Sequence, residues 1–305
     1  MRHSPLSARL RDAATLPARP GPARVSPAET VAAETVAPPL VAVAHGSRDP
    51  RAAASVGALL DLVRRRAAGA GYPGLGVRAA YLGHAAPTLG QALGALEGEA
   101  VVLPLLLTAA YHSKSDIPKA LHEARTAQPR LGIAYGRPLG PHPLLLRALD
   151  RRLAEALGAQ CDGAQCDGPQ CGGDGSDRSA VPPEDTAVVL AAAGSSDPAA
   201  NAVIADLAAR WQSARGWRAV LPAYASAASP APPDAVAAAR RAGARQVLVA
   251  SYLLSPGIFA DQIRRYCLAA GATAVSGVLG PAPEVADVLL GRYAESLADG
   301  AAAAV

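Results

Sequence analysis

Residues 40–50 have the sequence Leu-Val-Ala-Val-Ala-His-Gly-Ser-Arg-Asp-Pro. The first five residues are all apolar, which is typical of a strand that is buried on both faces of a parallel sheet. Asp49 followed by Pro50 is a common helix start, with Asp as the capping residue and Pro at the first helical position. A glycine and a serine between the two allow a tight turn. The segment therefore predicts a strand, a short loop that carries His45, and a helix.

Strand-like and helix-like segments continue to alternate after this point. Short apolar runs are separated by stretches with helical spacing of apolar residues, such as Val56, Leu59 and Val63. This alternation predicts parallel strands joined by right-handed crossovers, and therefore an α/β fold. The third apolar run contains Pro104. Proline is unfavourable in a central strand because it has no N–H to donate, so the extent of this strand is less clearly defined. The predicted strands are 40–44, 77–82, 101–107 and 132–137, and the predicted helices are 51–66, 88–96, 116–127 and 143–157.

The second half of the chain repeats the first. The segment 189–198, Val-Leu-Ala-Ala-Ala-Gly-Ser-Ser-Asp-Pro, matches 41–50 at an offset of 148 residues. Residues 253–259, Leu-Leu-Ser-Pro-Gly-Ile-Phe, match 106–112 at an offset of 147. Two matches at nearly the same offset indicate a duplicated domain. We therefore expect two similar lobes, each a parallel four-stranded sheet with helices on both faces.

Composition sets the boundaries of these lobes. Residues 1–38 lack periodicity and are expected to be a disordered tail, because they bury too little apolar surface to offset chain entropy. The lobes are predicted at 39–158 and 185–299, with a Cys-, Gly- and Asp-rich linker at 159–184. Its cysteines, Cys161, Cys166 and Cys171, lie in three near-copies of one pentapeptide. They either handle metal or result from repeat slippage, since their spacing matches no standard zinc or iron–sulfur pattern.

Composition also narrows the classes of partner. The 305 residues are 50% apolar and 18% charged, which predicts a sizeable core rather than disorder. The net charge is +4. The sequence has no basic run with interleaved aromatics, which is the pattern that would indicate nucleic-acid binding. No apolar run approaches the roughly 20 residues that span a bilayer, and no targeting segment is evident. We therefore expect a cytoplasmic protein that binds neither nucleic acid nor membrane, with a small anionic ligand.

Six histidines are present, and all lie in the tail or the first lobe. His45 ends the first predicted strand, and His112 closely follows the third. In a doubly wound sheet of order 2-1-3-4 those strands are neighbours, and a crevice opens between their carboxyl ends. Two imidazoles there can converge on one metal ion or one ligand. The alternative is that each is a hydrogen-bonded loop histidine. The second lobe has Ala193 and Phe259 at the corresponding positions.

Further candidates surround this crevice. Ser47, Arg48 and Lys114 flank the two histidines and either bind an anionic ligand or are solvated loop residues. Asp116 is expected to cap the helix that follows it. Two more histidines are candidates for the mouth of the crevice: His84 follows the second strand, and His142 follows the fourth.

These motifs resemble a known family. The segment 45–50, His-Gly-Ser-Arg-Asp-Pro, together with 105–118, Leu-Leu-Leu-Thr-Ala-Ala-Tyr-His-Ser-Lys-Ser-Asp-Ile-Pro, is similar to the sirohydrochlorin chelatases of the CbiX/SirB group. The segment 138–143, Pro-Leu-Gly-Pro-His-Pro, is also similar. The resemblance covers roughly 40–157 and, in weaker form, 186–298. It implies two tandem chelatase-like, flavodoxin-like lobes that form a pseudo-dimer within one chain.

The resemblance also implies an activity. Members are class II chelatases, lyases that insert Co²⁺ or Fe²⁺ into sirohydrochlorin without ATP, on the route to cobalamin or sirohaem, with no cofactor beyond the substrate metal. The two family histidines correspond to His45 and His112, as metal ligands and catalytic bases. Arg48, Ser47 and Lys114 would then bind the carboxylates of the tetrapyrrole, and the second lobe would form a wall over the crevice.

One departure from the family pattern keeps other functions open. Relatives often carry an acidic residue where this chain has Gly83, and His84 either replaces its proton-handling role or is a surface histidine. A non-catalytic tetrapyrrole or metal carrier is therefore the main alternative. A phosphohistidine enzyme is less well supported, because Ala44 stands where histidine phosphatases have arginine.

Overall fold

The computed structural model describes residues 37–108, 115–163 and 181–303, with no side-chain description for 159–163 and 301–303. Most of the predicted tail, His112, Lys114, Cys166 and Cys171 lie outside the described residues. The side chain of Cys161 is also outside them. Within the described ranges, no helix combines the length and the apolar content needed to cross a bilayer.

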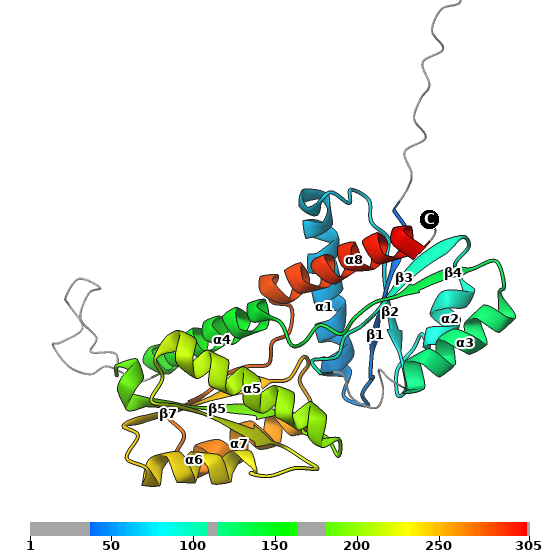
Figure 1. Ribbon diagram of the computed structural model, residues 1–305. Coiled ribbons are helices and arrows are strands. Elements are labelled where there is room, and N and C mark those ends of the chain that lie inside the picture. The colour runs from blue at the N-terminus through cyan, green and yellow to red at the C-terminus, as the bar shows by residue number, and fades with distance from the viewer. Residues whose placement is uncertain (1–36, 109–114, 164–180, 304–305) are drawn as a thin grey trace, which may run out of the picture. The chain divides into compact units, whose positions relative to one another are not determined.

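The first sheet has the predicted parallel order, β2-β1-β3-β4 (Figure 1). Its strands are β1 (Leu40–Ala44), β2 (Val77–Tyr81), β3 (Glu99–Pro104) and β4 (Gly132–Tyr135). The third strand ends at Pro104, three residues before the predicted end. The ring of Pro104 has no N–H to donate, and the next hydrogen bond runs from Leu105 N to Val43 O at 2.8 Å. The helices that follow the first three strands are α1 (Pro50–Ala67), α2 (Leu89–Gly94) and α3 (Ile117–Ala127), and a short 3₁₀ turn, η1, spans Ala68–Ala70.

The second sheet repeats this order as β6-β5-β7-β8, again all parallel. The predicted duplication of one α/β unit is therefore confirmed. The strands are β5 (Thr186–Ala192), β6 (Ala219–Tyr224), β7 (Gln246–Tyr252) and β8 (Ala274–Val275). The helices are α5 (Pro198–Arg215), α6 (Pro232–Arg241) and α7 (Ile258–Ala269), and the 3₁₀ turn η3 (Pro183–Asp185) precedes β5.

The last helix of each repeat packs on the other sheet. Helix α4 (Pro143–Gly163) follows β4 in the chain but lies against β7 and β8, whereas α8 (Pro283–Ala303) follows β8 but lies against α1, β3 and β4 (Figure 1). Each of these two exchanged helices makes a side-chain contact with a helix of the other repeat. Trp211 Nε1 in α5 donates to Asp150 in α4 at 3.0 Å, and Arg66 in α1 pairs with Asp287 in α8 at 2.7 Å. The packing units therefore differ from the units of the repeat. In the following, the first lobe means β1–β4 with α1–α3 and α8, and the second lobe means β5–β8 with α4–α7.

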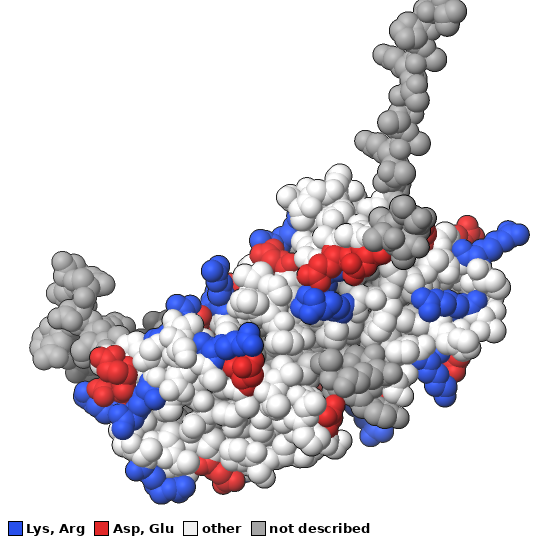
Figure 2. Space-filling view, viewed as in Figure 1, with Lys and Arg blue, Asp and Glu red and all other residues white. Residues whose placement is uncertain are grey.

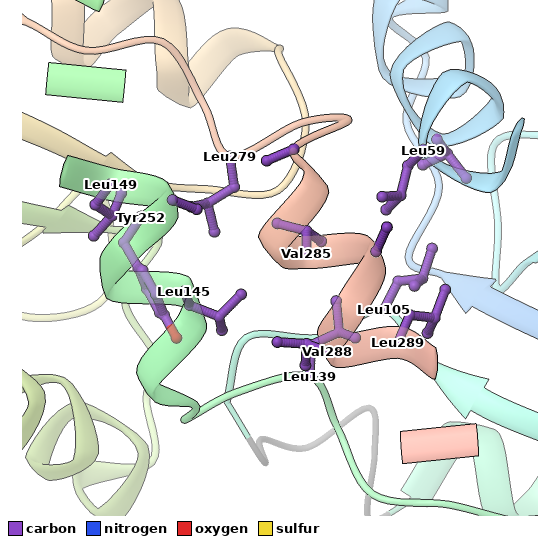
Figure 3. Packing of buried hydrophobic residues seen from close by; sticks show 14 of the residues in the cluster. Leu59, Leu105, Leu139, Leu145, Leu149, Tyr252, Leu279, Val285, Val288 and Leu289 are labelled. Carbon is purple, nitrogen blue, oxygen red and sulfur yellow. The ribbon is translucent and has the colours of Figure 1, made fainter. Parts of the chain in front are cut away.

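The exchange produces one core that both lobes share. Alternate residues of β1 and β5, such as Leu40 and Leu190, face this shared core, and the residues between them face a separate core in each lobe. Figure 3 shows Leu145 and Leu149 of α4 beside Tyr252 of β7, with Val285 of α8 between these side chains and Leu59 of α1. Neither lobe completes its apolar interior without a helix from the other repeat, which supports the expectation of a pseudo-dimer.

The ends of the predicted tail and linker belong to the packed structure. The carbonyl of Pro38 accepts a hydrogen bond from the Tyr293 hydroxyl at 2.6 Å. Helix α4 continues to Gly163, and Pro182 O accepts from the Thr186 hydroxyl at 3.0 Å. Cys267 is buried in α7, and burial raises the pKa of its thiol to about 12.

Charged side chains are scattered over the described surface. On the face shown in Figure 2, Lys and Arg side chains often lie next to Asp and Glu side chains. Ion pairs also join the exchanged helices to their neighbours, for example Arg151 with Glu284 and Arg215 with Asp150. Such exposed or half-exposed pairs contribute little each, about 0–1 kcal/mol.

Candidate active site

The loop between β1 and α1 carries His45 and is fixed by its backbone. Gly46 has a φ of +91°, and a Cβ atom there would lie 1.7 Å from the carbonyl oxygen of Gly83. Glycine is required because the left-handed backbone and the close approach both exclude a side chain. The N–H of Gly83 donates to the carbonyl of His45 at 3.1 Å. The end of β1 is therefore held against the loop after β2, and the His45 side chain is exposed.

The start of α1 has the predicted cap. The Asp49 carboxylate accepts from the backbone N–H of Arg51 at 2.9 Å, and the Ser47 hydroxyl accepts from the N–H of Asp49 at 3.1 Å. Hydrogen bonds from the side chain and backbone of Arg51 hold the pKa of Asp49 below its usual value. The Arg51 guanidinium also reaches Asp261 in α7 at 2.6 Å. The helix start that follows the His45 loop is thus joined to the second lobe.

A cavity of about 700 Å³ lies between the two lobes at this loop. Its first-lobe wall includes His45, Ser47, Arg48 and His84, so four of the seven predicted site residues share one cavity. The opposite wall consists of residues 253–260, at the end of β7 and the start of α7. A second-lobe wall was expected from the sequence. The volume lies within the range of typical small-molecule sites, about 300–1,000 Å³.

His84 follows β2 and is exposed, with a φ of 60°. This left-handed conformation is uncommon for a residue other than glycine. The equivalent residue of the second lobe, Ala227, has a φ of 59°, so the conformation belongs to the scaffold. What is particular to the first lobe is the imidazole that this turn presents to the cavity.

Two smaller cavities also reach His45. One of about 550 Å³ lies within the first lobe and is lined by polar side chains that include His84, Asp116, Lys119 and Glu123. The other, of about 300 Å³, is lined by residues 105–108 of the first lobe and by 192–195 of the second. His45 therefore lies where three cavities meet.

Three further residues that the sequence singled out are His112, Lys114 and Asp116. His112 and Lys114 lie outside the described residues, but Thr108 and Asp116, on either side of them, each line a cavity that His45 also lines. Asp116 does not cap α3 as predicted. Its own backbone is already helical, with φ −69° and ψ −44°, so its side chain makes no cap hydrogen bond.

His142 is not part of the lining of the 700 Å³ cavity. Its Nδ1 atom accepts a hydrogen bond from the backbone N–H of Leu144 at 3.2 Å, at the start of α4. Burial, and then the charge of Arg292, lower the pKa of His142. Its observed contact is therefore with a helix end.

Sequence reasoning did not single out Ile258, Asp261 or a role for Phe259, although all three belong to the start of α7 that faces His45 or Arg51. The alignment of the two copies of the repeat matches Phe259 with His112, and this match was the sequence feature that could have pointed to Phe259. In the described part of the chain, no group of three or more His, Cys, Asp or Glu side chains is arranged to hold a metal ion.

Relatives with assigned names are moderately similar. The chain is 28% identical over 165 residues to the sirohydrochlorin cobaltochelatase of Priestia megaterium, covering 54% of this chain and 48% of that protein. It is 29% identical over 188 residues to the sirohydrochlorin ferrochelatase of the same species, covering 60% and 62%. The matched region is thus about half to three fifths of the length of these relatives.

Solved structures share the fold. SirB from Bacillus subtilis with Fe³⁺ superposes with a TM-score of 0.68 at 23% identity, covering 87% of this chain and 98% of that chain. The sirohydrochlorin chelatase SirB from Bacillus subtilis subspecies spizizenii in complex with cobalt superposes with a TM-score of 0.63 at 22% identity, covering 85% and 95%.

The CbiX family model matches residues 39–156 and again residues 187–296. These two matches correspond to the two copies of the repeat, and together they cover well over half of the chain. The chain belongs to the CbiX family.

Proposed function

We propose that this protein inserts Co²⁺ or Fe²⁺ into sirohydrochlorin without ATP, at a step that leads to cobalamin or sirohaem. The observation that supports this most directly is the place of His45, at the meeting point of the 700 Å³ cavity between the lobes and two smaller cavities. Family membership and the names of the relatives indicate the substrate class.

The chemistry of insertion fits two histidines. Two pyrrole N–H protons leave the macrocycle as the metal enters, so the site needs a base and a ligand that releases its ion. Neutral imidazole accepts protons near pH 7 and binds first-row divalent metals. We assign these roles to His45 and His112. A site with few protein ligands leaves coordination positions open for the four macrocycle nitrogens, whereas a closed four-ligand cage would retain the metal.

The acidic edge of the substrate requires donors and cations. We assign its carboxylates to Arg48, to the loop at Ser47 before the start of α1, and to Lys114. His84 lines two cavities that His45 also lines. It is our candidate for passing on the released protons, in place of the acidic residue that relatives often carry at the position of Gly83. His142 is left out of this assignment, because its Nδ1 atom is engaged at the start of α4.

Insertion can be followed directly with purified full-length protein, metal-free sirohydrochlorin and Co²⁺ or Fe²⁺, by the absorbance change on metallation. We expect the wild-type rate to exceed the uncatalysed rate and the His112→Ala variant to lose nearly all of that excess. His122→Ala is the matched control, since His122 is an exposed histidine of α3. An undiminished rate in His112→Ala would overturn the mechanism.

A carrier of tetrapyrrole or metal is the second candidate, and Gly83 is the observation that favours it. Without the acidic group, the cavity could bind the macrocycle but transfer its protons poorly. Saturable binding of sirohydrochlorin with no rate above background, for either metal, would support this function over catalysis.

A further inference from the structure

Helix α7 begins with two apolar side chains that the fold leaves exposed. Ile258 is 71% exposed and Phe259 is 40% exposed. Among the described residues, every large hydrophobic side chain that is exposed lies on this helix, the other two being Tyr266 and Leu268. Neither Ile258 nor Phe259 belongs to a core cluster. The helix is packed through Ile263 and Cys267, which are buried. Phe259 lies on the same side, four residues before Ile263, but it is at the helix start and stays partly exposed. The fold therefore leaves apolar surface of Ile258 and Phe259 uncovered.

The position of this turn is well defined. Gly257 precedes it with φ 156° and ψ −170°, a conformation available essentially only to glycine. The carbonyl of Gly257 accepts the first helical hydrogen bond, from Asp261 N at 3.0 Å. The Asp261 carboxylate in turn meets Arg51 of α1 at 2.6 Å. The backbone that carries Ile258 and Phe259 is thus held at the cavity from both of its ends.

Both side chains line the 700 Å³ cavity on the wall opposite the His45 loop. The deeper lining is apolar as well, with Val56, Leu105 and Leu253, whereas Ser47 and Arg48 supply polar and cationic groups on the first-lobe side. A flat, conjugated ring with carboxylates around its edge matches this distribution, since its face needs apolar contact and its edge needs donors.

We propose that Phe259, supported by Ile258, is the surface on which one face of the tetrapyrrole packs while the histidine side of the first lobe serves the other face. The proposal rests on the proposed function. In the repeat, Phe259 occupies the position that holds His112 in the first lobe. On the proposed function, this position of the repeat supplies an imidazole for the metal in the first copy and an aromatic ring for the macrocycle in the second.

The test is a fluorescence titration of full-length protein with metal-free sirohydrochlorin, followed by insertion kinetics with Co²⁺. Losing the buried contact of one aromatic side chain is expected to raise the Kd and the KM about tenfold in Phe259→Ala, with kcat changed less than about twofold. Phe259→Tyr retains the ring and should bind like wild type. Tyr266→Ala is the matched control, because Tyr266 lies on the same helix, is 48% exposed and is not in the cavity lining.

The outcomes separate the two claims. Wild-type insertion together with unchanged sirohydrochlorin affinity in both Phe259→Ala and Ile258→Ala overturns this inference and leaves the proposed function standing. An equal loss of affinity in Tyr266→Ala also overturns it, since the effect would then be general to α7. A wild-type protein that neither binds nor metallates sirohydrochlorin defeats both claims.

Discussion

The two lobes use the same scaffold and differ in what they place on it. Each has the strand order 2-1-3-4, an Asp cap followed by Pro at the first position of an 18-residue helix, and a glycine with φ near +90° packed against the loop after the second strand. Only the first lobe has imidazoles at the carboxyl ends of its strands. The comparison teaches that the turn geometry belongs to the scaffold that both copies share, whereas the imidazoles belong to the first copy alone.

The second lobe also closes the loop that the first lobe leaves open. The side chain of Asn201 accepts from Ser195 N at 3.0 Å and donates to Ser195 O at 2.7 Å, and the Ser226 hydroxyl donates to Ala193 O at 3.0 Å. The first lobe has Ala53 and Gly83 at the positions of Asn201 and Ser226, and neither has a polar side chain to do this. Ala53 offers no such acceptor to the N–H of Ser47, which is equivalent to that of Ser195, and we propose this N–H as a donor to the substrate.

The largest effect is expected when His45 is replaced by alanine, the residue at the equivalent position, Ala193, of the second lobe. In His45→Ala, the rate of metal insertion should fall at least a hundredfold, as is typical when a general base is removed. The absorbance assay with Co²⁺ measures this. The reciprocal variant, Ala193→His, should leave the rate unchanged. A His45→Ala protein with a wild-type rate would show that the imidazole is dispensable and that the lobes do not differ in the way described.

A smaller effect is expected from giving the first-lobe loop the side-chain hydrogen bond that Asn201 makes in the second lobe. In Ala53→Asn, the new amide should accept from Ser47 N as Asn201 does from Ser195 N. Because a hydrogen bond to a charged carboxylate is worth about 1.5–3 kcal/mol, the KM for sirohydrochlorin should rise at least tenfold. Ala53→Leu adds similar volume without the amide. An equal rise in KM for both variants would attribute the effect to lost space and contradict the role of the Ser47 N–H.

Most of the fold was predictable because its signals are local. Buried strands such as Leu40–Ala44 and Thr186–Ala192 are continuous apolar runs, and Asp–Pro pairs mark the helix starts. The exchange of α4 and α8 was not predictable from these signals. A stripe such as Leu145, Leu149 and Leu153 specifies that a helix is buried, but it fits either sheet equally well.

The site was predictable only where the repeat and the motifs coincide. The His45 loop follows from strand, turn and cap residues, and the structure places it at the cavity. Asp116 shows the limit of this reasoning, since a preceding turn that is already helical removes the need for a cap. The apolar wall at Phe259 requires knowledge of which loops face each other across the lobes, and local patterns do not carry that information.

A change in stability without a change in activity is expected in the second lobe. Asn201→Ala removes the two hydrogen bonds that this side chain makes to the backbone of Ser195 and should lower the free energy of unfolding by about 1–2 kcal/mol, because the loop is only partly buried. Chemical denaturation measures this, and insertion kinetics should be unaffected. Asn201→Asp keeps the acceptor for Ser195 N and should lose less. A fall in insertion rate comparable to that of Ala53→Asn would contradict the division of roles between the lobes.

The smallest effect concerns the residue before each exchanged helix, which is His142 before α4 and Ala282 before α8. The two backbones match, since Leu145 N donates to His142 O and Val285 N donates to Ala282 O, both at 3.0 Å. Only His142 adds a side-chain acceptor, for Leu144 N. The stability contributed by the start of α4 should therefore depend on pH, whereas that contributed by the start of α8 should not.

The direction follows from the pKa of His142, which burial and the charge of Arg292 lower from its ordinary value of 6.5. The unfolded chain then takes up a proton at His142 at a higher pH than the folded protein does. The stabilisation is accordingly complete above about pH 6.5 and is lost as the pH falls below it. His142→Asn keeps a capping acceptor that does not titrate, so its free energy of unfolding should fall less than that of wild type between about pH 7.5 and 5.5, by under about 1 kcal/mol. Identical pH profiles for wild type and His142→Asn would disprove the titration of this cap.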